Sequence, residues 1–183
     1  MTLLKRLAAF LDLLLEAFTV LLMVVLTVIV IVAVLVRLAG DSFSWYDEVA
    51  AIMLSWITYY GSALAALRRR HIGFDSVLLS IPSQFRMWAV AFGEAVVLTF
   101  FVLMAYTGFQ VLAVLQGSYL VSLTWVPVQV TQSVIPIGAI LFIICQLLSL
   151  PDYWQKTKAG ISLEHAEIDE EVEAELAKNA PRT

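Results

Sequence analysis

Four long runs of apolar residues dominate the chain and alternate with short polar segments. They cover residues 13–36, 49–67, 88–114 and 128–150. An α-helix rises about 1.5 Å per residue, so about 20 apolar residues cross the roughly 30 Å hydrocarbon core of a bilayer. Each run is long enough for one crossing, and we predict four transmembrane helices.

The last run contains a proline and ends at another. Pro136 lies inside the run, where a proline removes a backbone N–H and its ring crowds the preceding turn. We expect Pro136 to kink or locally loosen this helix. Pro151 should stop it.

The composition leads to the same fold class. Hydrophobic residues make up 61% of the chain and charged residues only 14%, outside the range of soluble globular domains. Seven of the fifteen acids lie between Glu164 and Glu175, so the net charge of −4 describes a tail. We therefore predict an all-α integral membrane protein, with a transmembrane domain in residues 1–158 and an acidic, flexible cytoplasmic tail in residues 159–183.

The distribution of basic residues predicts the orientation, because lysine and arginine in short loops stay on the cytoplasmic side. Four spans place both termini and the hairpin of residues 68–87 on one side of the membrane. Only Arg37 lies near the opposite ends of the spans. The basic residues near the shared side are Lys5, Arg6, Arg68, Arg69, Arg70, Arg86, Lys156 and Lys158. We predict an N-in, C-in topology with a basic cytoplasmic hairpin.

A few ionisable residues lie within or beside the spans, where an unpaired charge is costly. Glu16 and Glu94 fall in the cytoplasmic half, at a depth similar to the arginines that end the second span. They either form an ion-pair layer with those arginines, or each side chain extends alone to the interface. On the outer side, Arg37 has Asp41, Asp47 and Glu48 within reach, and we expect a second pairing there.

No set of residues predicts a catalytic or cofactor site. The two histidines, His71 and His165, lie in a loop and in the tail, away from the depth at which a membrane haem needs its axial ligands. Cys145 is the only cysteine. His71 and Asp75 could form a metal or proton-relay pair, but a histidine packed near headgroups is the simpler interpretation. We expect no enzyme activity, no cofactor, no metal and no nucleic-acid partner.

The connection between the third and fourth spans is unusually apolar. No charged residue occurs from Ala95 to Pro151. The connecting residues 116–127 include Tyr119, Leu120, Val121 and Trp125, which are too apolar for a free loop in water. This segment lies either in the outer membrane interface or under a partner protein.

Several of these residues occur in an order that is typical of one family. They are Ser44-Trp45, Asp47-Glu48, Trp56, Gly61, the run from Arg68 to Asp75, Pro82 and Ile135-Pro136-Ile137-Gly138. Placed on four spans, they resemble the small membrane subunit, the Q-type or DctQ-like component, of tripartite ATP-independent periplasmic (TRAP) transporters. The resemblance covers about residues 41–138. The first span matches only as a hydrophobic helix, and the acidic tail has no counterpart.

The resemblance implies a non-catalytic subunit in the bacterial cytoplasmic (inner) membrane. Such a subunit braces a large multi-span subunit that carries substrate and sodium, while a periplasmic binding protein delivers an organic acid. The expected outer-side organising or partner-contact residues are Trp45, Asp47, Glu48, Tyr119 and Trp125. The expected inner-side residues are Glu16, Arg68, Arg69, Arg70, His71, Asp75 and Glu94. Helix packing is expected at Gly61, Ser62, Ala65, Pro136 and Gly138, because small residues let helices approach closely.

Two other functions remain open on the sequence alone. One is an autonomous four-helix exporter or channel that uses Glu16 or Glu94 as its coupling carboxylate. The other is an assembly factor for a respiratory complex. Dependence of transport on a larger membrane protein separates the first from the subunit hypothesis, and the identity of co-purified partners decides the second.

Overall fold

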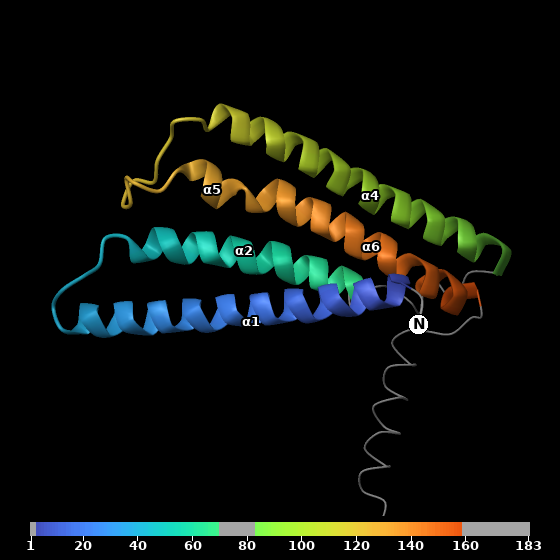
Figure 1. Cartoon of the computed structure of the whole chain (residues 1–183), viewed down its shortest axis with the longest axis horizontal. Coiled ribbons are helices and arrows are strands. Elements are labelled where there is room, and N and C mark those ends of the chain that lie inside the picture. Colours follow the sequence, from blue (N-terminus) through green and yellow to red (C-terminus); the bar gives the residue numbers. More distant parts are fainter. Residues whose placement is uncertain (1–2, 70–82, 159–183) are drawn as a thin grey trace, which may run out of the picture. The chain divides into compact units, whose positions relative to one another are not determined.

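The computed structural model describes residues 3–69 and 83–158 of the chain. Its helices are α1 (Leu3–Leu38), α2 (Tyr46–Leu67), α4 (Ser83–Val114), α5 (Val128–Gln132) and α6 (Val134–Lys158) (Figure 1). Four stretches of these residues are long and apolar enough to cross a membrane: Lys5–Leu38, Tyr46–Leu67, Phe85–Val114 and Val128–Gln155. The prediction of an all-α membrane protein with four spans is confirmed.

Three helices are longer than the spans predicted from apolar runs. α1 begins at Leu3 instead of residue 13, α4 at Ser83 instead of residue 88, and α6 ends at Lys158 instead of residue 150. Lysine and arginine are good helix formers, so the backbone hydrogen bonds continue where the apolar residues stop. Hydropathy therefore marks the part of each helix suited to hydrocarbon and underestimates the helix itself.

The fourth span is interrupted near its start. α5 ends at Gln132 and α6 begins at Val134, with Ser133 between them as the C-cap of α5. Pro136 has no N–H to donate to the carbonyl of Gln132, and its ring crowds that carbonyl. The expected loosening by Pro136 is confirmed, and it takes the form of a break between two helices.

The prediction that Pro151 ends the last helix is wrong, because α6 continues through Pro151 to Lys158. The φ of proline, about −65°, is compatible with a helix, so the main loss is the hydrogen bond to the carbonyl of Leu147. Membrane helices tolerate this loss where nearby groups satisfy the freed carbonyl.

The chain divides into two compact units, residues 1–70 with 98–149, and residues 71–97 with 150–183. The first unit contains α1, α2, α5, the second half of α4 and most of α6. In the second unit, the described residues belong to the first half of α4 and the end of α6, where Val90 and Thr157 are buried.

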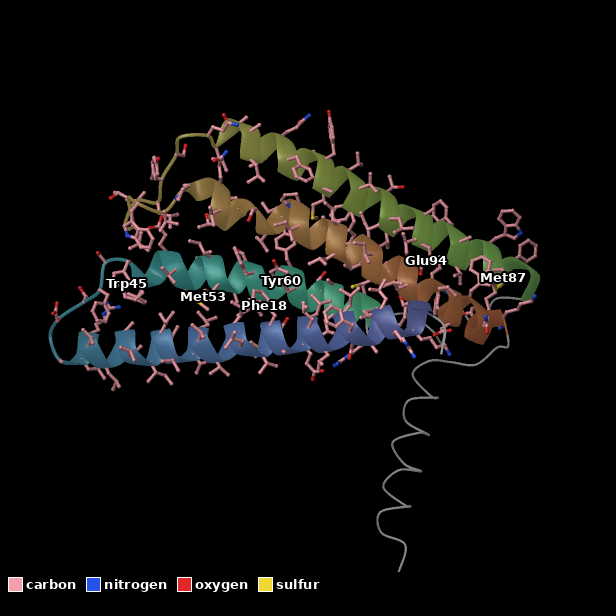
Figure 2. The ribbon with its side chains drawn as sticks, in the orientation of Figure 1. Phe18, Trp45, Met53, Tyr60, Met87 and Glu94 are labelled. Carbon is pink, nitrogen blue, oxygen red and sulfur yellow. The ribbon has the colours of Figure 1, made fainter. Side chains whose placement is uncertain are left out.

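Within the first unit, α1 and α2 lie side by side and are joined by residues 39–45 (Figure 1). Gly40 in this connection has a φ of +92°, a conformation that glycine adopts without steric cost. Phe18 and Tyr60 meet edge to face between the helices, with ring centroids 4.9 Å apart (Figure 2). Such aromatic pairs add to the stability that burial alone supplies.

One face of α6 is buried in the first unit. Its buried residues recur at helical spacing: Val134, Ala139, Phe142, Cys145, Gln146 and Ser149. A Cβ atom on Gly138 would lie 2.7 Å from Cβ of Tyr59, and one on Gly108 would lie 3.0 Å from Cδ of Pro136. These two glycines therefore let α2 and α4 approach α6 closely.

Large apolar side chains remain exposed along α1 and the second half of α4. Examples are Leu13, Val24 and Leu35 on α1, and Phe100 and Leu103 on α4. Apolar surface of this extent is not stable in water, and it fits contact with lipid chains or a second membrane protein. The polar groups that could organise the chain lie at the two ends of the helices.

Candidate functional site

The end of α2 carries an arginine that is bound by two acids of α1. Arg68 donates from Nε to Asp12 Oδ1 at 2.7 Å and from Nη2 to Asp12 Oδ2 at 2.9 Å. The same Nη2 donates to Glu16 Oε2 at 2.5 Å. Asp12 and Glu16 are one helical turn apart, so both carboxylates face the same guanidinium. The paired hydrogen bonds to Asp12 fix the direction of the side chain as well as its distance.

The neighbouring arginine points to another helix. Arg69 donates from Nε to Ser149 Oγ at 2.8 Å and from Nη2 to the carbonyl of Gln146 at 3.1 Å. Ser149 Oγ in turn lies 3.1 Å from the carbonyl of Ala66, to which it donates. Both side chains of this α6 pair are buried. The last turn of α2 is thus joined to α6 by side-chain and backbone groups.

The backbone of Arg69 has an uncommon conformation at the end of α2. Its φ is +53°, a left-handed conformation that is uncommon for residues other than glycine. The conformation ends α2, and the N–H of Arg69 donates to the carbonyl of Ala66 at 3.3 Å. A left-handed residue costs about 1–2 kcal/mol. The contacts with Ser149 and Gln146 offset this cost.

Together, Arg68 and Arg69 form an arginine lock that joins α2 to α1 on one side and to α6 on the other. The hydrogen bonds from Arg68 to Asp12 and then to Glu16 raise the pKa of this guanidinium above its ordinary value. Arg68 therefore stays charged, and its pairing with Asp12 and Glu16 does not depend on its own titration. The lock links three helices through side-chain hydrogen bonds.

At the other end of α2, a carboxylate organises the connection between α4 and α5. Glu48 accepts hydrogen bonds from the N–H of Val121 at 3.1 Å and of Ser122 at 2.9 Å, and from the Ser122 hydroxyl. Glu48 lies in the first turn of α2, where a negative charge is favoured by the helix dipole. The expected pairing of Arg37 is wrong: in residues 3–69 and 83–158, no ion pair joins it to Asp41, Asp47 or Glu48.

A tryptophan of α2 contacts the break in the fourth span. Nε1 of Trp56 donates to the carbonyl of Thr131 at 3.0 Å. Thr131 lies in α5, just before the break, where the helix no longer supplies a full set of donors. Gln129 Nε2 donates to the carbonyl of Leu112 at 2.9 Å, which links α5 to α4.

The remaining predicted residues lie as follows. Trp45 precedes α2 and packs near Phe43, Asp47 is exposed, and Tyr119 and Trp125 are exposed in the connection between α4 and α5. Glu94 is half-buried on α4 (Figure 2). It belongs to the second unit, whereas Arg68 and Arg69 belong to the first, so its pairing with these arginines stays a prediction. Arg70, His71 and Asp75 lie outside the described residues.

The predicted packing residues lie on two helices. A Cβ on Gly61 would lie 3.9 Å from Cγ2 of Thr19 on α1, an ordinary contact. Ser62 and Ala65 are half-buried, and the fully buried small residues of this stretch are Ala63 and Ala66. Pro136 and Gly138 are buried on α6. Gly138 makes the closest contact of the set, against Tyr59.

Sequence reasoning missed several contact residues. Asp12 lies four residues before Glu16, and this spacing is a signal that both share one face of α1. Gln146 and Ser149 are polar residues three positions apart in an apolar run, which favours a buried hydrogen-bonding face. Among the residues that the structure describes, no three His, Cys, Asp or Glu side chains are grouped as a metal site.

One comparison with known proteins finds a match, to a family model. No curated protein matches the chain. Residues 26–155 match the family model of the DctQ component of tripartite ATP-independent periplasmic transporters. The match covers all of α2, α4 and α5 and most of α6, including Arg68, Arg69, Glu48 and Trp56. The chain belongs to the DctQ family, the small membrane components of TRAP transporters.

Proposed function

We propose that this chain is a non-catalytic scaffold that braces the large membrane subunit of its transporter. In such a transporter, the small membrane component works with a large membrane subunit and a periplasmic binding protein. The cargo proposed for this complex is an organic acid, delivered by the binding protein and imported by the large subunit with sodium. The proposed location is the bacterial inner membrane, with both termini in the cytoplasm.

The arginine lock is the observation that supports bracing. A scaffold has to keep its own helices in fixed positions while a partner moves against them. Arg68 and Arg69 connect α2 to α1 and α6 through hydrogen bonds of 2.5–3.1 Å that involve charged groups. Such bonds are about twice as strong as neutral ones, and they specify direction.

The ion pair of Glu16 also favours a scaffold over an autonomous exporter. A coupling carboxylate has to bind and release a cation during transport. Glu16, the carboxylate that an exporter would use on α1, is bound to Arg68 at 2.5 Å. Release of Glu16 would break one of the contacts that join α1 to α2.

Reconstitution tests the proposal. We expect proteoliposomes with this chain alone to show no uptake of a carboxylate delivered by the binding protein, and those with both membrane subunits to show sodium-dependent uptake. Arg68→Ala combined with Arg69→Gly should lower the initial rate at equal amounts of both subunits. Arg37→Ala, which removes an arginine with no ion pair in the described residues, is the matched control. Uptake by the chain alone would contradict the proposal.

A further inference from the structure

The connection between α4 and α5, residues 115–127, is a hairpin in which half of the backbone N–H groups donate to acceptors within the chain. Leu120 and Val128 donate to the carbonyls of Val126 and Ser118, and Tyr119 pairs with Pro127. Six of its twelve backbone N–H groups have protein acceptors: those of Leu115, Ser118, Leu120, Val121, Ser122 and Val126. These hydrogen bonds order the hairpin, and Glu48 accepts two of them.

The hairpin turns large apolar side chains outward. Val121 is 91% exposed, Trp125 76% and Tyr119 54%, whereas Leu120 is 8% exposed and points inward. No charged residue occurs in the hairpin, or anywhere from Ala95 to Pro151. A charged group of α2, Glu48, is bound to the backbone of Val121 and Ser122.

These properties favour a lipid surface over a soluble partner. A docking surface for a soluble protein carries charges that set its specificity. This hairpin has an exposed tryptophan, tyrosine and valine and no charged residue. That combination suits the membrane interface, where aromatic rings are favoured.

We infer that the hairpin of residues 115–127 is a lipid anchor, which inserts Tyr119, Val121 and Trp125 into the interface of the leaflet at the α4 end. It continues the apolar surface of α4, whose last residue, Val114, is 83% exposed. Glu48 is the positioning residue, because it holds the tip of the hairpin through two backbone amides. The inference concerns this chain's own contact with lipid and is independent of the proposed bracing function.

Spin labelling tests the inference directly. The buried Cys145 is replaced by alanine, and Val121→Cys is labelled with a nitroxide in the full chain, reconstituted in phosphatidylcholine–phosphatidylglycerol nanodiscs. Collision rates with oxygen, which concentrates in lipid, and with a water-soluble nickel chelate are then measured. Val28→Cys on α1 is the lipid reference, and Asp41→Cys in the charged connection between α1 and α2 is the water reference. Both positions are exposed.

We expect the oxygen-to-nickel ratio at residue 121 to lie well above that at residue 41 and toward that at residue 28. A ratio equal to that at residue 41 would overturn the inference, because the hairpin would then be in water. The measurement is repeated after the large subunit and the binding protein are added. Loss of both collision rates at residue 121 would also overturn it, because a protein would then cover the hairpin.

Discussion

Arg69 holds a left-handed backbone conformation, with a φ of +53°, while its Nε donates a hydrogen bond of 2.8 Å to Ser149 on α6. The strain and the contact belong to the same residue, so substitutions can separate them. Glycine adopts this conformation freely but has no side chain, whereas alanine loses the side chain and keeps the strain.

We therefore expect Arg69→Ala to destabilise the chain more than Arg69→Gly, by about 1 kcal/mol. Both variants lose the contacts with Ser149 and Gln146. Thermal unfolding in detergent, monitored by tryptophan fluorescence, measures the stability of the two variants. An Arg69→Gly variant more stable than the natural chain by the full strain of about 1 kcal/mol would show that the link to α6 contributes nothing.

The two acids of α1 should contribute unequally to the arginine lock. Asp12 accepts two hydrogen bonds from Arg68 and is 34% exposed, whereas Glu16 accepts one and is 49% exposed. A double-mutant cycle between Arg68→Ala and Asp12→Ala should give a coupling of roughly 1 kcal/mol, as for a well-oriented, partly exposed pair. The same cycle with Glu16→Ala should give less. Equal couplings would contradict the bidentate geometry.

Glu48→Gln should release the tip of the hairpin between α4 and α5. A hydrogen bond to a charged group contributes about 1.5–3 kcal/mol, and its loss leaves the amides of Val121 and Ser122 weakly held. Hydrogen–deuterium exchange of the peptide that contains these residues should become at least about tenfold faster. Asp47→Asn, at an exposed acid in the same turn of α2, is the matched control and should leave exchange unchanged.

Gly138→Ala should weaken the packing of α6 on α2. The new Cβ would lie 2.7 Å from Cβ of Tyr59, which is close to the backbone and cannot move away easily. Overpacking of this kind costs about 1–3 kcal/mol. Gly93→Ala on α4, where no atom lies within 4 Å of the new Cβ, should be neutral or stabilising. Thermal unfolding of both variants checks the contrast.

The apolar runs were sufficient to predict the four spans, because a long hydrophobic helix is the simplest way to satisfy backbone groups in lipid. They could not locate the ends of α1 or α6. Helical hydrogen bonding continues through Lys5 and Arg6, and past Pro151, where hydropathy falls. Pro136 did carry a correct signal, since the missing N–H and the crowded ring act locally.

The long-range contacts could not be predicted from the sequence for another reason. Glu48 and Ser122 are 74 residues apart, and Arg69 and Ser149 are 80 apart. Their pairing depends on how α2, α4 and α6 pack, which small residues such as Gly138 allow but do not specify. Neighbouring arginines also look equivalent in sequence. In the structure, Arg68 binds acids of α1 and Arg69, at the left-handed end of α2, binds α6.

The central claim is that the helices joined by Arg68 and Arg69 stay fixed while the transporter works. Nitroxides at Leu14→Cys on α1 and Leu147→Cys on α6, both at exposed positions, report this directly in a Cys145→Ala chain. Pulsed electron–electron double resonance measures the distance distribution between the two nitroxides in the reconstituted complex. We predict one narrow distribution that is unchanged by sodium, binding protein and cargo and is broadened by Arg68→Ala with Arg69→Gly. A distribution that shifts during transport would contradict the account.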